Sequence, residues 1–392
     1  MMGTWLQQVA MGWLAYRLSG SAWLLGVLAF CANIAILLLG PFAGVLADRV
    51  NRRHALFVTQ SLMLAQALAL TALTALGHIE VWHLILFALW LGTVSAFDVP
   101  LRQSLYVHLV DDRADLPNAI ALNSFLVNAA RVVGPALAGI LLSLAGEAAC
   151  FALNALSFVA VIVAIAQMRW PHMTPPAPSA GLWLNWLEGA RYALGFAPSR
   201  ALLTLVAVLS WTITPYSSLM PIYAKDIYGG DAHTLGLLLS AAGTGALTCT
   251  AYLAGRSTIR GLGRVIAGAA AISGVALAAF SYLRVFPIAL VMMALVGGGV
   301  ILAAASANTI LQTIVDDRLR GRVAGFFMMA FLGVAPIGNL AAGALAATFG
   351  APATFLGNGV VAALAALWFW RRLPAMSILL RPTYKRLGII VD

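Results

Sequence analysis

The chain has 392 residues, of which 62% are hydrophobic and only 9% are charged, and its mean hydropathy is +0.94. Soluble domains carry about a quarter charged residues, so a water-soluble globular protein is excluded. The net charge of +10 does not indicate a nucleic-acid partner, because the basic residues lie scattered in the hydrophilic gaps between long uncharged stretches.

Twelve membrane-spanning helices are predicted when the chain is divided at its charged or turn-forming gaps, since a span needs about 20 apolar residues. They lie near residues 1–16, 22–46, 55–77, 82–105, 118–144, 149–168, 201–223, 234–255, 264–283, 286–311, 322–347 and 352–370. The last two come from one uncharged run, 323–370, in which Gly350 and Pro352 supply the residues that a chain reversal needs.

The first predicted span is short. Helical residues 1–16 reach only about 24 Å, whereas the hydrocarbon core is about 30 Å thick. Alignment of Gly26 with Gly236 in the second half places the start about ten residues late. We therefore expect a chain shortened at its N-terminus, through a start codon assigned too late or through real truncation.

Lys and Arg are distributed unequally between the two sides of the predicted spans. Nineteen lie in loops or at helix ends on one side, and three lie on the other, namely Arg17, Lys225 and Arg284. Positively charged loops stay in the cytoplasm. The sequence thus predicts a multi-pass membrane protein with both termini cytoplasmic.

The connection between the sixth and seventh spans is the longest hydrophilic one. Its prolines, from Pro171 to Pro178, exclude a helix there. Apolar residues at helical spacing from Trp183 to Leu194 then predict a helix that lies on the membrane surface. We expect a six-helix bundle over 1–169, a cytoplasmic linker with this interfacial helix over 170–200, a second bundle over 201–373 and a cytoplasmic tail over 374–392.

The two halves repeat one another. Five residues recur 204 positions later: Gly134, Gly139, Gly146, Phe151 and Asn154 return as Gly338, Gly343, Gly350, Phe355 and Asn358. Two halves in the same orientation are a plan found in transporters whose halves move about a central site. The expected fold class is an all-α membrane protein with two parallel six-helix bundles.

Several motifs resemble one known group of transporters. Gly44–Arg53 resembles the G-x-x-x-D-R-x-G-R-R motif of the major facilitator superfamily, with Asn51 in place of a glycine; asparagine tolerates the left-handed turn expected there. Gly3–Ala10, Phe97–Pro100, Asn128–Gly139 and Arg320–Arg322 resemble the bacterial exporter branch that includes enterobactin exporters and macrolide efflux proteins. The resemblance runs over essentially the whole chain.

This resemblance implies secondary active export of a small amphipathic molecule, siderophore or drug-like, by alternating access. The chain has only two lysines, neither preceded by glycine, so it holds no phosphate-binding G-x-x-x-x-G-K-[ST] loop and an ion gradient must supply the energy. We expect antiport against protons. A facilitator or importer of a small metabolite on the same fold, or a membrane scaffold that does not transport, is the alternative.

By resemblance, the Gly44–Arg53 motif is a cytoplasmic gate. Its residues are Gly44, Asp48, Arg49, Arg52 and Arg53. The resemblance places Asp48 against the positive N-terminus of the eleventh span, near 320–323, where a carboxylate gains about 0.3–2 kcal/mol. Anchoring by positive charge at a helix end is the alternative.

Asp98 is the only acid within a predicted span, and Arg131 is the only basic residue at comparable depth. Ionisable groups in a bilayer are costly unless they are paired, protonated or wetted. We expect the two to pair across the fourth and fifth spans. The pair either carries a proton or responds to substrate, or it is a fixed ion pair that only holds the helices together.

Two further sets of residues have open alternatives. Gly134, Pro135 and Gly139 are a candidate hinge, although close helix packing explains the same residues. Polar residues in several spans are candidates for a substrate cavity, with interhelical hydrogen bonding as the alternative. They are Gln7, Gln8, Asn33, Trp211 and Asn308, together with Asn123, Asn128, Asn339 and Tyr216.

Catalytic and metal-binding patterns are weak in this sequence. His78, Glu80 and His83 form H-x-E-x-x-H rather than the zinc motif H-E-x-x-H. Cys31, Cys150 and Cys249 fall in apolar stretches, as buried thiols do. We expect a monomer that is not an enzyme and binds no cofactor or metal; its partners are a small-molecule substrate, protons and the lipid bilayer.

Overall fold

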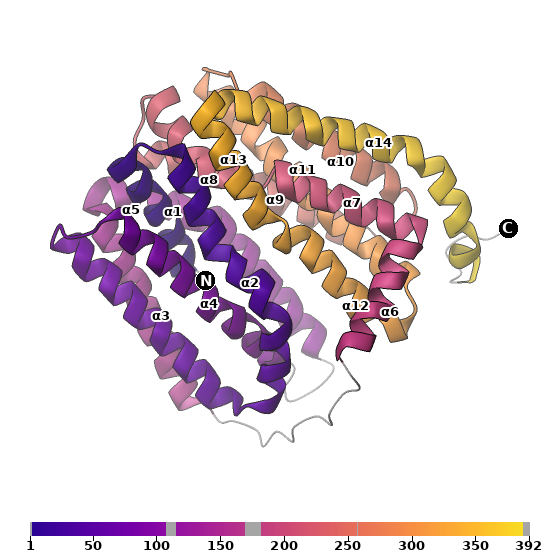
Figure 1. Ribbon diagram of the computed structural model, residues 1–392, viewed down its shortest axis with the longest axis horizontal. Helices are drawn as coiled ribbons and strands as arrows, with labels where there is room; N and C mark the ends of the chain where they lie inside the picture. The colour runs from indigo at the N-terminus through magenta and orange to yellow at the C-terminus, as the bar shows by residue number, and fades with distance from the viewer. Residues whose placement is uncertain (1, 107–114, 169–181, 257, 387–392) are drawn as a thin grey trace. The chain divides into compact units, whose positions relative to one another are not determined.

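The computed structural model describes residues 2–106, 115–168, 182–256 and 258–386, and the regular structure in these ranges is helical (Figure 1). The helices are α1 (Met2–Ser19), α2 (Ala22–Arg49), α3 (Arg52–Ala75), α4 (Val81–Tyr106), α5 (Leu116–Gln167), α6 (Leu182–Gly195), α7 (Ala197–Thr212), α8 (Tyr216–Ile222), α9 (Ala232–Ala254), α10 (Leu262–Phe280), α11 (Phe286–Ile314), α12 (Asp317–Met328), α13 (Ala335–Phe349) and α14 (Ala351–Arg386), with π-helical turns η2 (Tyr223–Ile227) and η3 (Met329–Gly333).

Ten helical stretches within the described ranges are long and apolar enough to cross a membrane. The predicted class, an all-α membrane protein, is thereby confirmed. Large apolar side chains are exposed along these stretches, among them Leu156 at 63% and Leu364 at 59%. Such exposure is expected where the neighbouring solvent is lipid.

The fifth and sixth predicted spans both lie in α5. Its helical backbone is interrupted at Gly146, which has φ 75° and ψ −176°. Glycine adopts a positive φ without steric cost, so the chain can turn there. The repeat counterpart, Gly350, has φ 83° and separates α13 from α14. The two halves thus place a glycine of the same conformation at equivalent breaks.

Two predicted boundaries differ from the structure. The span predicted over 201–223 is interrupted at 213–215, between α7 and α8. The tail predicted from residue 374 begins inside α14, which continues through Pro374 and Pro382 to Arg386. The Ser377 hydroxyl donates to the carbonyl of Pro374, three residues earlier on the same helix, at 2.7 Å.

The chain forms two compact units. The first comprises residues 1–177 and 218–240; the second comprises 178–217 and 241–392. In the first, α1 packs on α5, α2 packs on α4, and α3 packs on both α4 and α5. A Cβ at Gly92 would lie 2.4 Å from the carbonyl oxygen of Ala32. The backbones of α2 and α4 therefore approach each other closely, as small residues permit in membrane helices.

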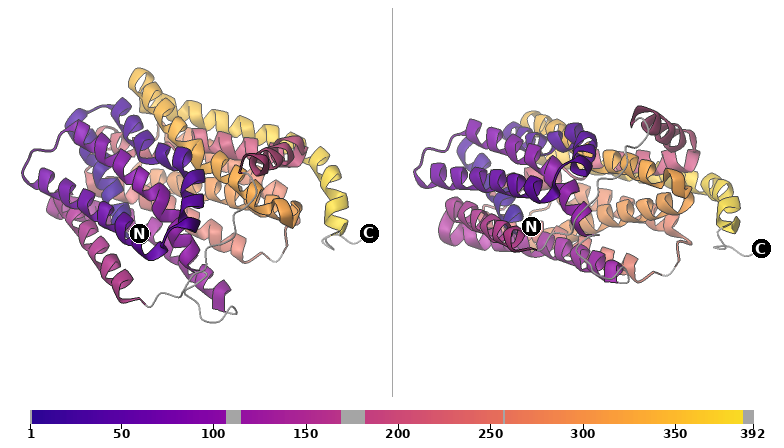
Figure 2. Two further views of the ribbon diagram at one scale, coloured as in Figure 1. Left: turned by 60° about the horizontal axis from the view of Figure 1, so that its bottom comes forward. Right: turned by 90° about the horizontal axis from the view of Figure 1, so that it is seen from below.

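In the second unit, α10 packs between α11 and α14, and α6 contacts α7 and α12 (Figure 1, Figure 2). A helix is formed where one was predicted before the seventh span, namely α6, and its position on the membrane surface stays a prediction. Arg322 of α12 forms an ion pair with Glu188 of α6, and the Tyr192 hydroxyl donates to the carbonyl of Ile314 at 3.2 Å. These contacts fix α6 against the junction of α11 and α12.

Candidate functional site

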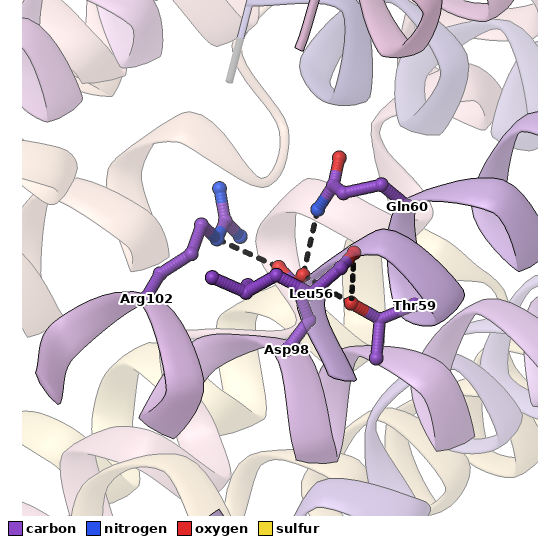
Figure 3. Close-up of polar contacts among 5 residues, drawn as sticks. All are labelled: Leu56, Thr59, Gln60, Asp98 and Arg102. Carbon is purple, nitrogen blue, oxygen red and sulfur yellow. Dashed lines mark hydrogen bonds and ion pairs between the residues drawn. The ribbon is translucent and has the colours of Figure 1, made fainter. Parts of the chain in front are cut away.

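The carboxylate of Asp98 is the centre of a buried polar cluster in the first unit. Asp98 lies on α4, two turns before Tyr106 ends the helix, and its side chain is fully buried. Thr59 and Gln60 of α3 both donate to its Oδ1, at 2.9 Å from Oγ1 and 2.6 Å from Nε2. Figure 3 shows these donors and Arg102 converging on Asp98. One oxygen of the buried carboxylate thus has two hydrogen-bond donors, which lower the cost of burying its charge.

Arg102 supplies the counter-charge. Its Nε lies 2.6 Å from Asp98 Oδ2, one helical turn further along α4, and its side chain is 36% exposed. The contact has ion-pair distance but not hydrogen-bond geometry, so Oδ2 accepts no hydrogen bond. One oxygen of Asp98 is therefore held by two directional donors and the other by charge alone.

The predicted partner of Asp98 was Arg131, and the structure pairs it with Arg102 instead. Residues four apart on a helix face each other, which makes this ion pair a local one within α4. Arg131 lies on α5 and is half-buried. The i,i+4 spacing of Asp98 and Arg102 is the signal in the sequence that indicates this pair.

The Thr59 hydroxyl has two acceptors within reach. Besides Asp98 Oδ1 it lies 3.1 Å from the carbonyl oxygen of Leu56, one turn earlier on α3. A hydroxyl carries a single hydrogen, so it donates to one of the two at a time. The hydrogen bond to Asp98 can be exchanged for one to Leu56 by rotation of the hydroxyl hydrogen.

Gln7, a candidate for the substrate cavity, is fully buried in a network of amides. Its Nε2 donates to Gln66 Oε1 at 3.0 Å, and its Oε1 accepts from Asn154 Nδ2 at 2.7 Å. Gln66 in turn donates to the carbonyl of Phe87 at 3.3 Å. The network joins α1, α3, α4 and α5, so for Gln7 the alternative of interhelical hydrogen bonding holds.

The other cavity candidates are more accessible. Gln8 and Asn33 are exposed in the first unit, and Asn33 Nδ2 donates to the carbonyl of Ala29 at 3.0 Å. Trp211 is 40% exposed in the second unit, where Asn308 is half-buried and accepts from Gln312 at 3.4 Å. Their role in a cavity stays a prediction.

The predicted gate motif spans the junction of α2 and α3. The surroundings of Gly44 and the side chains of Asp48 and Arg49 lie outside the described part of the structure. Asn51 has extended backbone, φ −65° and ψ 107°, and its side chain accepts from the amide of His54 at 3.2 Å. It is therefore an N-cap of α3 and not the left-handed turn residue that the motif suggests.

Arg53 of the same motif binds the end of another helix. Its Nη2 donates to the carbonyl of Ala166 at 3.0 Å, next to Gln167, where α5 ends. A cation at a helix C-terminus satisfies a free carbonyl and interacts favourably with the helix dipole. In this structure Arg53 ties the start of α3 to the end of α5; the gate itself stays a prediction.

The candidate hinge residues make close helix contacts. A Cβ at Gly134 would lie 2.7 Å from Cβ of Trp5 on α1, and one at Gly139 would lie 2.8 Å from the carbonyl of Ala232 on α9. Pro135 lies within continuous helix. The packing alternative is thus observed, while the hinge stays a prediction.

A contact that the sequence did not indicate joins α1 to η2. The Tyr16 hydroxyl donates to Asp226, and Lys225 Nζ lies 5.6 Å from the centroid of the Tyr16 ring. Nearby, Arg17 forms an ion pair with Glu147 at 2.8 Å. Tyr16 and Asp226 are 210 residues apart in sequence, so no local pattern could have predicted their contact.

His78, Glu80 and His83 make local contacts in the turn before α4. The Glu80 amide donates to His83 Nδ1 at 3.1 Å, and Trp82 Nε1 donates to the Glu80 carboxylate at 2.7 Å. Among the residues that the structure describes, no group of three or more His, Cys, Asp or Glu side chains could hold a metal ion.

Comparison with known families accounts for this architecture. The profile of the transmembrane secretion effector family matches residues 1–383. The chain belongs to this family of major facilitator transporters. The resemblance read from the Gly44–Arg53 motif and the exporter motifs is thereby confirmed. The family and its named relatives are transporters.

Three relatives cover most of the chain. The staphyloferrin A transporter of Staphylococcus aureus is 25% identical over 92% of this chain and 90% of its own length. The multidrug efflux pump Tap of Mycolicibacterium fortuitum is 25% identical over 90% and 88%. The enterobactin exporter EntS of Salmonella choleraesuis is 26% identical over 78% and 73%.

Solved structures share the fold at lower identity. A bacterial homologue of the iron transporter ferroportin, in an inward-facing state, is 18% identical, with a TM-score of 0.70 over 94% of this chain and 96% of that chain. At this identity the likeness concerns the fold alone.

Proposed function

We propose that this chain is a secondary active exporter that moves a small amphipathic molecule, siderophore or drug-like, out of the cytoplasm by alternating access. The family match over 1–383 carries the proposal. It is supported by relatives named for a siderophore and for drug efflux. The protein would act as a monomer in the bacterial inner membrane.

Twelve spans in two six-helix bundles fit this function. Division of α5 at Gly146 and inclusion of α1 bring the ten candidate spans to twelve. The bundles would comprise 1–169 and 201–373, joined by the cytoplasmic linker 170–200. With an even number of spans, both termini lie on one side, and the excess of arginine in the loops assigns that side to the cytoplasm.

We further infer that Asp98 carries the coupling proton. The proposal is supported by its burial at 0% exposure together with its half-exposed partner Arg102. As an anion, Asp98 is stabilised by Thr59, Gln60 and Arg102. A proton would be taken up by the carboxylate, and Gln60 could still donate to the oxygen that carries no proton.

Neutralisation of Asp98 removes the attraction that holds Arg102, and the Thr59 hydroxyl can donate to Leu56 instead. Proton uptake therefore frees the Arg102 side chain without requiring α3 or α4 to unfold. Inward movement of one proton supplies about 2.3 kcal/mol per 100 mV of membrane potential. In this mechanism the release of Arg102 is the event that a conformational change can follow.

The test measures cargo uptake by the Asp98→Asn variant in inside-out membrane vesicles whose interior is more acidic than the medium. Asparagine keeps a similar shape but takes up no proton, so we expect uptake of a siderophore or fluorescent drug to fall to the level without a gradient. Exchange of labelled for unlabelled cargo should persist. Glu80→Gln, which removes an exposed carboxylate of the same unit, is the matched control.

Gradient-driven uptake by Asp98→Asn at the wild-type rate would show that Asp98 does not carry the proton and has only a structural role. The direction of transport is tested separately by a deletion strain, in which we expect lower siderophore secretion or higher drug sensitivity. Accumulation of cargo outside the deletion strain at wild-type levels, with unchanged drug sensitivity, would favour an importer or facilitator.

A further inference from the structure

The net positive charge of the protein lies in one of its two units. Residues 178–217 and 241–392 hold fourteen Lys and Arg against four Asp and Glu, whereas the first unit holds nine of each. No acidic residue occurs between 232 and 315 or between 351 and 391. The positive charges of these two segments therefore have no carboxylate within the same segment to balance them.

Helix packing gathers several of these charges at one place. A Cβ at Gly274 of α10 would lie 2.6 Å from the amide nitrogen of Ala363 on α14, and one at Gly263 would lie 2.8 Å from Leu373. As residue numbers fall along α10 they rise along α14, so the helices are antiparallel. Figure 1 shows the two helices side by side. The start of α10 therefore lies beside the Arg371 region of α14.

Four arginines occupy this end of the helix pair. We call them the arginine cluster: Arg260, Arg264, Arg371 and Arg372. All four side chains are exposed, and Arg372 lies over the ring of Trp368 at 4.8 Å. Among the described residues, no carboxylate forms an ion pair with Arg264, Arg371 or Arg372.

Arg256 belongs to the same loop but has a different role. Its guanidinium donates to the Tyr252 hydroxyl at 2.8 Å and to the carbonyl of Arg260 at 2.7 Å. These bonds join Arg256 to Tyr252 on α9 and to Arg260, close to the start of α10. Arg260 is thereby presented next to the first turn of α10, where Arg264 lies.

In the proposed topology, the arginine cluster lies at the depth of lipid headgroups. The stretch 351–370 of α14 is uncharged, and its 20 residues span about 30 Å, the thickness of the hydrocarbon core. Leu364 and Trp370 on this stretch are 59% and 50% exposed, as are Ile272 and Val275 on α10 at 51% and 59%. Arg371 and Arg372 follow at once, where the membrane surface begins.

We propose that the arginine cluster binds the headgroup of an anionic phospholipid, such as phosphatidylglycerol, in the leaflet that faces the cytoplasm. Guanidinium groups form bidentate hydrogen bonds to phosphate, and the exposed apolar faces of α10 and α14 contact the acyl chains. Assignment of this end to the cytoplasm rests on the proposed topology. The binding itself does not depend on what the protein transports.

The test measures lipid binding to the purified full-length protein in detergent by native mass spectrometry. Phosphatidylglycerol and phosphatidylcholine with identical acyl chains are compared at equal concentration. We expect wild type to prefer phosphatidylglycerol and Arg371→Gln to weaken its binding about fivefold, as expected for one basic residue at an anionic surface. The fourfold variant Arg260→Gln, Arg264→Gln, Arg371→Gln, Arg372→Gln should show no preference.

Arg284→Gln is the matched control, because it removes one exposed arginine from the opposite end of α10. Equal binding of the two lipids by wild type, or an equal loss in Arg284→Gln and Arg371→Gln, would overturn the proposal. Soluble glycerol phosphate forms the second arm: if it displaces the lipid at similar concentration, the cluster is a site for free phosphate. Should the fourfold variant fail to fold, the single variants decide.

Discussion

Gln7 and Gln8 are neighbours in sequence with opposite surroundings. Gln7 is fully buried and bonded to Gln66 and Asn154, whereas Gln8 is exposed. Gln7→Leu would leave one buried acceptor and one buried donor without partners. We expect a loss of about 1–3 kcal/mol of stability, read as a lower unfolding temperature in detergent.

Gln8→Leu is the control for this experiment, because it makes the same chemical change one residue away. Its unfolding temperature should stay at the wild-type value. If Gln7→Leu unfolds at the wild-type temperature but exports poorly, Gln7 contacts the cargo after all, and the cavity role predicted from the sequence is restored.

For single residues, the sequence predicts which side chain is a buried ionisable group more readily than it predicts the residues that bind it. Asp98 stood out because it is the only acid in a predicted span, and the cost of burying charge marks such a residue. Its donors Thr59 and Gln60 did not stand out, because polar residues on α3 look alike in sequence whether they face a neighbour or not. Only the register between α3 and α4 selects them.

At the scale of helices, Gly297 on α11 can be interpreted either as a hinge or as a site of close helix packing, like the candidate hinge residues. A Cβ there would lie 2.1 Å from the carbonyl oxygen of Ala242 on α9. Gly297→Ala must therefore separate α9 from α11, and we expect it to cost about 1–3 kcal/mol, as overpacking does. The measurement is again the unfolding temperature of the purified protein.

Gly268→Ala on α10 is the corresponding control, since a Cβ at Gly268 meets no atom within 4 Å. Alanine favours helix over glycine by about 1 kcal/mol, so this variant should unfold at or above the wild-type temperature. A Gly297→Ala variant as stable as Gly268→Ala, yet inactive in export, would show that Gly297 is a hinge.

Spans were predictable as elements because a bilayer sets the length of an apolar helix. Their interruptions were harder to place. Pro215 lies in the break at 213–215, and η3 ends at Gly333, but proline also occurs inside continuous helix, as Pro135 does in α5, so such residues alone do not mark a break. Helix α6 is an intermediate case. Its spacing predicted a surface helix, but its ion pair from Glu188 to Arg322 depends on how α12 is placed.

For the whole molecule, the excess of arginine in the loops predicts which segments face the cytoplasm. A cysteine at Asn51, the exposed cap of α3, should react with a membrane-impermeant maleimide only after the membrane is opened. A cysteine at Tyr282, which is 58% exposed beyond α10, should react in intact cells. Labelling of position 51 in intact cells would contradict the predicted topology and place the start of α3 outside the cell.

The internal repeat predicted two halves, and the observed units do not follow that division. Residues 218–240 belong to the second half in sequence and to the first unit in structure. The repeat reports shared ancestry of helices, whereas unit membership reports contacts such as Tyr16 with Asp226 and Gly139 with Ala232. Those contacts join distant residues and cannot be inferred from either half alone.

The contact between Tyr16 and Asp226 also determines when the first unit can be completed during biosynthesis. Tyr16 leaves the ribosome 210 residues before Asp226. At about 5–20 residues per second, α1 spends about 10–40 s in the membrane before its partner is made. The first unit is therefore completed only after synthesis of the second half has begun, and until then the insertion machinery or lipid must cover the surface of α1 that η2 will occupy.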